Sequence, residues 1–143
     1  MAVVNLLGES IIDNKINVGP HELSVTENLH NLSDDVINSS AVDGHTTKDG
    51  IHAQLDKLPY YSTHQVLSIG GNDLLQNMFF LKNTEQLTAN EVFEQSVGIM
   101  APIKRRYQTI VEKLSLQNSN ILLCTVSVAY TYLTLPTPNY VEF

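Results

Sequence analysis

Residues 65–73 read QVLSIGGND, a short apolar run that ends in two glycines and an Asn-Asp pair. A run of this kind, bounded by turn residues, predicts a buried β-strand over residues 65–69. Asn72 and Asp73 are typical of a helix start, because their side chains can accept hydrogen bonds from the first backbone N–H groups of a helix. The segment therefore predicts a strand that passes through a glycine turn into a helix.

The same alternation continues on both sides of this segment. Short apolar or β-branched runs predict further strands at residues 3–7, 35–40 and 120–126. Apolar residues at helical spacing predict helices at 21–32, 47–58, 72–81 and 89–116. In the last of these, Pro102 is expected to kink or break the helix. Strands that alternate with helices favour an α/β fold, here a three-layer α/β/α flavodoxin-like sandwich with a parallel sheet.

The length of 143 residues predicts a single domain over residues 1–143. The formal net charge of −7 argues against binding to nucleic acid, which requires clustered positive charge. The longest apolar stretch, residues 121–135, is interrupted by Ser and Thr and is too short to span a bilayer. No positively charged segment precedes the apolar run at the amino terminus, which favours a cytoplasmic location and leaves secretion open.

Cysteine and histidine usage limits the chemistry further. Cys124 is the one cysteine, so the chain has neither an internal disulfide nor a multi-cysteine zinc site. The acids and histidines show no spacing that would place metal ligands on a shared face. The sequence thus predicts no metal and no cofactor.

In a parallel α/β sheet, functional groups gather at the carboxyl ends of the strands. Three such ends are predicted, at residues 8–14, 41–47 and 70–73. Ser10 offers a hydroxyl, Gly44 a backbone N–H that a ligand can approach closely, and Asn72 a side-chain amide. Taken alone, each has an ordinary structural explanation, as a helix cap or a turn residue. Together they are the parts of an oxyanion hole beside a hydroxyl nucleophile.

Three blocks of the sequence resemble those of the SGNH hydrolases, also called GDSL esterases and lipases. They are GESIIDN at 8–14, SAVDGHTT at 40–47 and GGND at 70–73. The resemblance covers about residues 3–126. It implies that Ser10 is the nucleophile, and that the N–H groups of Ser10 and Gly44 and the side chain of Asn72 form the oxyanion hole. It also implies supporting roles for the turn residues Asp13, Asn14, Gly70 and Asp73.

The sequence departs from the family pattern in two places. Glu9 stands where the family usually has Asp, a change expected to shift the turn slightly. The family's DxxH block, which supplies the catalytic His and Asp, has no counterpart after residue 126, and no histidine follows His64. His45, beside Gly44, is expected to be an exposed or substrate-lining loop residue; His21, His30 and His52 are expected at the surface.

The last residues differ in composition from the helix before them. Residues 130–143 read YTYLTLPTPNYVEF, with three tyrosines, two prolines and no basic residue. We expect a divergent tail over 127–143 in a truncated or frame-shifted family member that lacks the last strand and helix. An uncovered sheet edge presents unpaired N–H and C=O groups, so we expect self-association through it.

The resemblance implies a serine hydrolase that acts on a small-molecule ester through an acyl-enzyme on Ser10, slowed or inactive without a base. A second interpretation is a non-catalytic module that binds acyl or carbohydrate esters on the same scaffold. A third, a flavodoxin-like phosphate binder, ranks last, because Glu9 in its anion loop would repel phosphate and Lys15 is the only cation near it.

Overall fold

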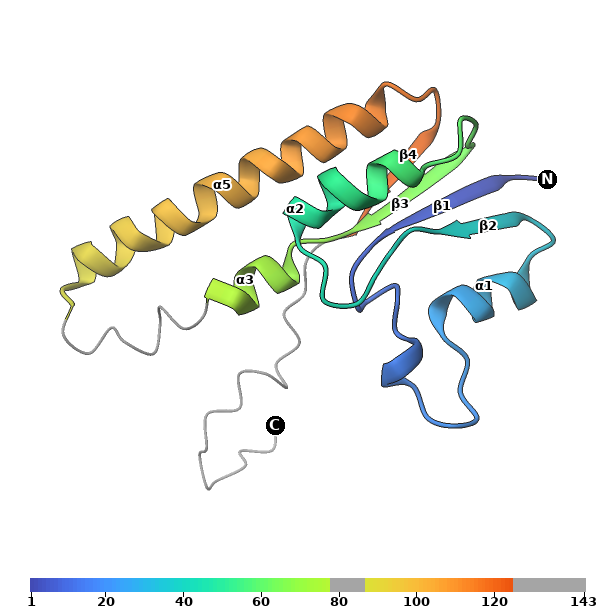
Figure 1. Cartoon of the computed structure of the whole chain (residues 1–143), viewed down its shortest axis with the longest axis horizontal. Coiled ribbons are helices and arrows are strands. Elements are labelled where there is room, and N and C mark those ends of the chain that lie inside the picture. Colours follow the sequence, from blue (N-terminus) through green and yellow to red (C-terminus); the bar gives the residue numbers. More distant parts are fainter. Residues whose placement is uncertain (78–86, 125–143) are drawn as a thin grey trace, which may run out of the picture.

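The structure is a computed structural model that describes residues 1–77 and 87–124, and a parallel four-stranded sheet forms its centre (Figure 1). The strands are β1 (Val3–Gly8), β2 (Val36–Ser39), β3 (His64–Ser68) and β4 (Asn120–Leu123). They lie in the order β2-β1-β3-β4, and every neighbouring pair is parallel. The predicted α/β class and parallel sheet are therefore confirmed.

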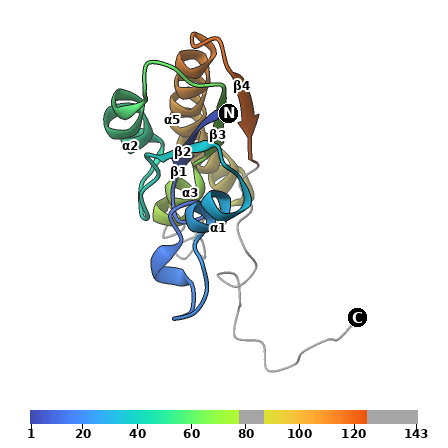
Figure 2. The ribbon, with the colours of Figure 1, turned by 90° about the vertical axis from the view of Figure 1, so that its right-hand side faces the viewer.

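Helices cover both faces of the sheet. Successive side chains of β1 point to opposite sides, so each face of the sheet has its own core. The core on one face consists of Leu7, Leu67, Ile69, Ile110 and Leu114, the last two from α5 (Ala89–Ser115). The core on the other face consists of Leu6, Ile12 and Ala41, with Leu29 of α1 (Val25–Leu32) packed against it. The layers can be followed from a second direction in Figure 2.

The helix predicted over residues 47–58 is present but irregular. It begins as α2 (Thr47–Asp49), widens into a π-type turn η2 (Gly50–Gln54) and tightens into a 3-10 turn η3 (Leu55–Lys57) before Pro59. A short 3-10 turn η1 (Lys15–Asn17) and α3 (Gly71–Asn77) complete the elements of the described residues. The predicted helical residues 78–81, strand residues 125–126 and tail 127–143 lie outside them.

Pro102 was expected to kink or break the long helix, and it does not break it. Helix α5 runs without interruption from Ala89 to Ser115, with Pro102 inside it. Proline removes the N–H that would bond to the carbonyl four residues earlier, here that of Gly98. Gly98 is exposed, so water can satisfy its carbonyl, and the helix continues.

Neither α5 nor any other helix of the described residues is long and apolar enough to cross a membrane.

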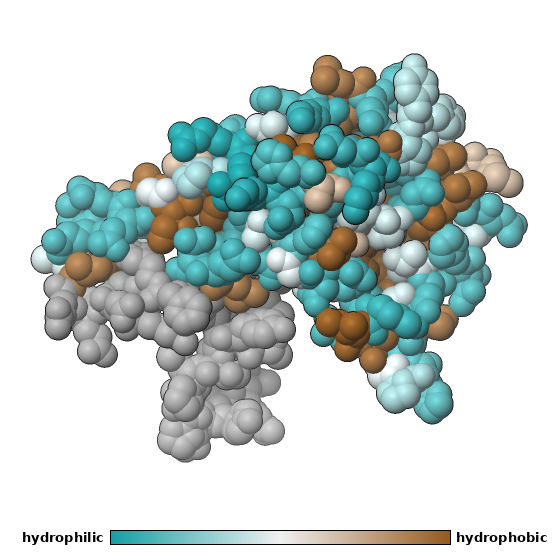
Figure 3. Space-filling model, in the orientation of Figure 1, coloured by the Kyte–Doolittle hydropathy of each residue, from teal (hydrophilic) through white to brown (hydrophobic). Residues whose placement is uncertain are grey.

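One edge of the sheet carries exposed apolar side chains. Leu122 and Leu123 of β4 keep 61% and 44% of their surfaces exposed, although their partners in β3 are largely enclosed. Hydrophobic patches interrupt the mostly hydrophilic face that Figure 3 shows. Self-association through the β4 edge stays a prediction.

Helices α1, α2 and α5 begin with capping boxes. The pairs of residues are Ser24 with Glu27, Thr46 with Asp49, and Thr88 with Glu91. A hydrogen bond from Lys15, together with bonds from Ser24, lowers the pKa of Glu27 to about 2. Bonds from their capping partners likewise hold the pKa values of Asp49 and Glu91 below the ordinary range.

Acid is therefore expected to destabilise the fold through these carboxylates. Because their pKa values are lower in the folded than in the unfolded state, their contribution is complete above pH 4.5, the ordinary Glu value, and declines as the pH falls toward about 2. Urea unfolding between pH 6 and pH 2 should show this decline, and Glu27→Gln should make it shallower. Identical profiles for the two proteins would contradict the assignment to Glu27.

Candidate active site

The turn that carries Ser10 leaves the sheet at the carboxyl end of β1. The backbone N–H of Glu9 still bonds to the carbonyl of Ser68 in β3, at 3.2 Å. The carbonyl of Glu9 then accepts the N–H groups of Ile12 and Asp13, both at 2.9 Å, which closes a tight turn around Ser10. Ser10 is half-buried at the rim of the sheet.

Gln54 of η2 holds the start of this turn. Its Oε1 accepts the N–H of Gly8 at 2.8 Å, and its Nε2 donates to the carbonyl of Gly8 at 2.8 Å. The same Nε2 lies 2.9 Å from Nδ1 of His45. Gln54 is buried. It was not among the site residues predicted from the sequence. Gln54 follows Ile51 by three residues and so lies on the apolar stripe of its helix. A polar residue at such a position was the sequence feature that could have indicated its role.

Glu9 joins the Ser10 turn to the start of α3. Its two carboxylate oxygens accept the N–H groups of Gly71 and Asn72 at 2.8 and 2.9 Å. The side chain is buried, and this burial raises its pKa, while the two backbone hydrogen bonds act in the opposite direction. Glu9 is therefore a link between two strand ends, a role that was not predicted from the sequence.

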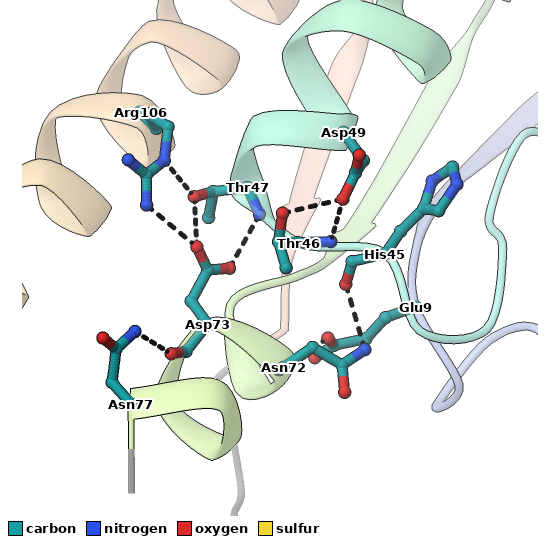
Figure 4. Close-up of polar contacts among 9 residues, drawn as sticks. All are labelled: Glu9, His45, Thr46, Thr47, Asp49, Asn72, Asp73, Asn77 and Arg106. Atoms are coloured by element: carbon teal, nitrogen blue, oxygen red, sulfur yellow. Dashed lines mark hydrogen bonds and ion pairs between the residues drawn. The ribbon is translucent and has the colours of Figure 1, made fainter. Parts of the chain in front are cut away.

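Asn72 in turn contacts the loop that contains Gly44. Its Nδ2 donates to the carbonyl of His45 at 3.0 Å (Figure 4). Gly44 is exposed and has a positive φ of 81°, and a Cβ placed there would have no neighbour within 4 Å. The N–H of the preceding residue, Asp43, donates to the carboxylate of Asp13 at 2.9 Å. The three predicted strand ends are thus connected to one another.

A second polar cluster lies behind Asn72. The carboxylate of Asp73 accepts both the N–H and the hydroxyl of Thr47 at 2.7 Å, and Arg106 of α5 contacts both residues (Figure 4). Asp73 and Thr47 are buried. Arg106 was not predicted. It lies on the apolar stripe of α5, three residues after Ile103 and four before Ile110, which was its only sequence signal.

The remaining predicted residues lie in turns around the site. Oδ1 of Asn14 accepts the N–H of Val25 at the start of α1, at 2.8 Å. Gly70 has a positive φ of 120° between β3 and α3.

Three N–H donors at this edge of the sheet point to no acceptor among the described residues. The backbone N–H groups of Ser10 and Gly44 make no hydrogen bond within residues 1–77 and 87–124. Asn72 uses one of its two Nδ2 hydrogens on His45 and keeps the other. A carbonyl oxygen that becomes negatively charged is the kind of ligand that such donors stabilise.

All five histidines lie within the described residues, and none of them forms a hydrogen bond with Ser10 there. The four exposed ones are His21, His30, His52 and His64, with His64 at the opposite, amino end of β3. His45 is half-buried, and its Nδ1 lies 2.9 Å from Nε2 of Gln54.

The described residues offer no group of three or more His, Cys, Asp or Glu side chains that could hold a metal ion. Cys124 follows β4, is half-buried, and donates its backbone N–H to the carbonyl of Leu67 at 2.9 Å.

Comparison with solved structures finds similar folds in lipases and esterases. The chain is similar to phospholipase A1 from Streptomyces albidoflavus NA297, with a TM-score of 0.59 and 15% identity over 90% of this chain. It is similar to TesA, with a TM-score of 0.60 and 17% identity over 91% of this chain. It also resembles the psychrotrophic esterase EstA from Pseudoalteromonas sp., with a TM-score of 0.56 and 17% identity over 92% of this chain.

The chain spans 64% of the length of the phospholipase and 63% of the lengths of TesA and EstA. No family model and no curated protein sequence matches it. At these low identities, the likeness establishes the fold. The chain has the SGNH hydrolase fold.

Proposed function

We propose that this chain carries the nucleophile and oxyanion hole of a carboxylic-ester hydrolase that acts through an acyl-enzyme on Ser10. The observation that supports this most is the set of three N–H donors without acceptors, on Ser10, Gly44 and Asn72, at connected strand ends of the described residues. The SGNH hydrolase fold and the lipase and esterase neighbours support the same reaction class.

The proposed reaction has two steps. The Oγ of Ser10 attacks the ester carbonyl carbon, and the resulting oxyanion accepts hydrogen bonds from the three donors. The intermediate collapses, the bond to the alcohol oxygen breaks, and the alcohol leaves with a proton. Water then attacks the acyl-serine, which releases the acid and restores the Ser10 hydroxyl.

The proton of Ser10 needs an acceptor in the first step. No histidine of the described residues forms a hydrogen bond with Ser10, so we propose that the proton passes to water. An oxyanion hole and substrate binding alone retain part of the rate enhancement of a serine hydrolase. All histidines of the chain lie within the described residues, so we expect the chain to turn esters over slowly.

The same observation favours a second function. Among the described residues, no histidine forms a hydrogen bond with the Ser10 hydroxyl. The three N–H donors would then bind the carbonyl of an ester and leave the ester intact. In that case the chain is a module that binds acyl or carbohydrate esters.

Replacing Ser10 by alanine is expected to abolish the release of p-nitrophenol from p-nitrophenyl acetate above the rate in buffer. It should also abolish labelling by an alkyl fluorophosphonate, in which Oγ forms a bond to phosphorus, fluoride leaves and the proton passes to solvent. The similar esterase EstA is inhibited by monoethylphosphonate, which is likewise an organophosphorus compound. Intact mass spectrometry measures the labelling.

Ser39→Ala is the matched control, because Ser39 is exposed on β2 and its hydroxyl makes no bond among the described residues. Equal rates and equal labelling for the wild-type chain and Ser10→Ala would refute the hydrolase proposal. An ester that raises the Tm of the wild-type chain without turnover or labelling would instead support the binding module.

A further inference from the structure

We propose that Arg106 is a positioning residue for the oxyanion hole, fixing the segments that carry Gly44 and Asn72. This inference rests on the proposed function, because it names the group that holds two of the three donors in place. Arg106 lies in the middle of α5, outside the three sequence blocks that predicted the site.

The guanidinium of Arg106 binds two residues from different strand ends. Its Nε donates to Oγ1 of Thr47 at 2.7 Å, and its Nη2 donates to Oδ1 of Asp73 at 3.1 Å. Thr47 and Asp73 are also bonded to each other twice, at 2.7 Å each. The three residues are therefore joined by four hydrogen bonds, three between side chains and one from the backbone N–H of Thr47.

Each partner of Arg106 is adjacent to a segment of the oxyanion hole. Asp73 directly follows Asn72, and Thr47 begins α2 three residues after Gly44. Asn72 also bonds directly to the Gly44 loop through the carbonyl of His45. A displacement of Thr47 relative to Asp73 would therefore change the separation between the Asn72 amide and the Gly44 N–H.

Charge and burial explain why an arginine is needed at this point. The Asp73 side chain is only 2% exposed, whereas that of Arg106 is 33% exposed. A buried carboxylate is stable only when it is paired and hydrogen-bonded. The planar guanidinium offers two N–H donors in fixed directions, which a lysine ammonium on a flexible stem does not.

The test compares Arg106→Gln and Arg106→Lys with Arg105→Gln, a matched control that removes the same charge from an exposed neighbour. Each full-length variant is first checked for a cooperative thermal transition. The rate of fluorophosphonate labelling of Ser10 is then measured over a range of probe concentrations. This separates the maximal labelling rate from the concentration that gives half of it.

We expect Arg106→Gln to lower the maximal labelling rate about 10- to 100-fold with the half-saturating concentration nearly unchanged, because a displacement of about 1 Å costs a reaction about 100-fold. Arg106→Lys should recover part of the rate, and Arg105→Gln should match the wild-type chain. Equal labelling of Arg106→Gln and Arg105→Gln would overturn the positioning role while the proposed function stands.

A second readout does not depend on the reactivity of Ser10. Hydrogen exchange and NMR shifts of the Gly44 N–H and the Asn72 side-chain amide should change in Arg106→Gln and remain unchanged in Arg105→Gln. Unchanged signals in both variants would refute the inference, even if Ser10 does not react. Absence of Ser10 labelling in the wild-type chain would refute the proposed function and the catalytic part of this inference with it.

Discussion

Gly8→Ala is expected to lower the free energy of unfolding by about 3 kcal/mol or more, the sum of backbone strain and overpacking at one position. A Cβ on Gly8 would lie 2.1 Å from the carbonyl oxygen of Ser68, a distance that two non-bonded atoms do not reach. The φ of Gly8 is +154°, which an alanine rarely adopts. Because the obstacle is the backbone of β3, neither partner can move without breaking the pairing of the two central strands.

Urea unfolding of the full chain measures this loss, and Gly98→Ala is the matched control. Gly98 lies on the exposed surface of α5, and a Cβ there would meet nothing within 4 Å. Alanine is the better helix former, so Gly98→Ala should leave stability unchanged or raise it by up to about 1 kcal/mol. Similar losses for the two variants would show that the β1 end is not constrained as the structure describes.

Asp73→Asn is expected to destabilise the fold by about 2–4 kcal/mol, because one partner of a largely buried ion pair is lost. The substitution preserves size but turns one acceptor oxygen into an NH₂ group. That group would face the N–H or the hydroxyl of Thr47, both of which are donors to the present carboxylate. Arg106 would lose its charged partner at the same time.

Thermal and urea unfolding measure this effect, with Asp56→Asn as the control. Asp56 lies in η3, is exposed, and has no side-chain hydrogen bond among the described residues. Its replacement removes the same formal charge and should change stability by less than about 0.5 kcal/mol. If both variants unfold alike, the Asp73 cluster does not stabilise the fold.

The strands and their place along the chain were predictable because they depend on local patterns. Apolar runs that end in glycine predicted β1 and β3, and both pair in the parallel sheet. The failure at Pro102 has a local cause, since the sequence rule does not consider whether water can reach the carbonyl that proline leaves without a donor. The weaker run at 35–40 was also recovered, as β2.

The contacts that hold the site could not be predicted in the same way. Gln54, Glu9 and Arg106 act on residues far along the chain, and no local pattern specifies those partners. Gln54 and Arg106 each interrupt an apolar helical stripe, which marks them as buried polar residues but does not say what they bind. Sequence blocks therefore located the functional groups, whereas the groups that position them required the structure.

The parallel sheet also determines when, during synthesis, the Ser10 turn can become ordered. Its neighbour β3 and the amides that Glu9 binds come much later: Gly71 lies 62 positions after Glu9. Closing such long loops costs chain entropy before any contact is gained, which makes sheets of this kind slow to form. The contacts that join the Ser10 turn to α3 can therefore form only after the segment that contains Gly71 and Asn72 has been synthesised.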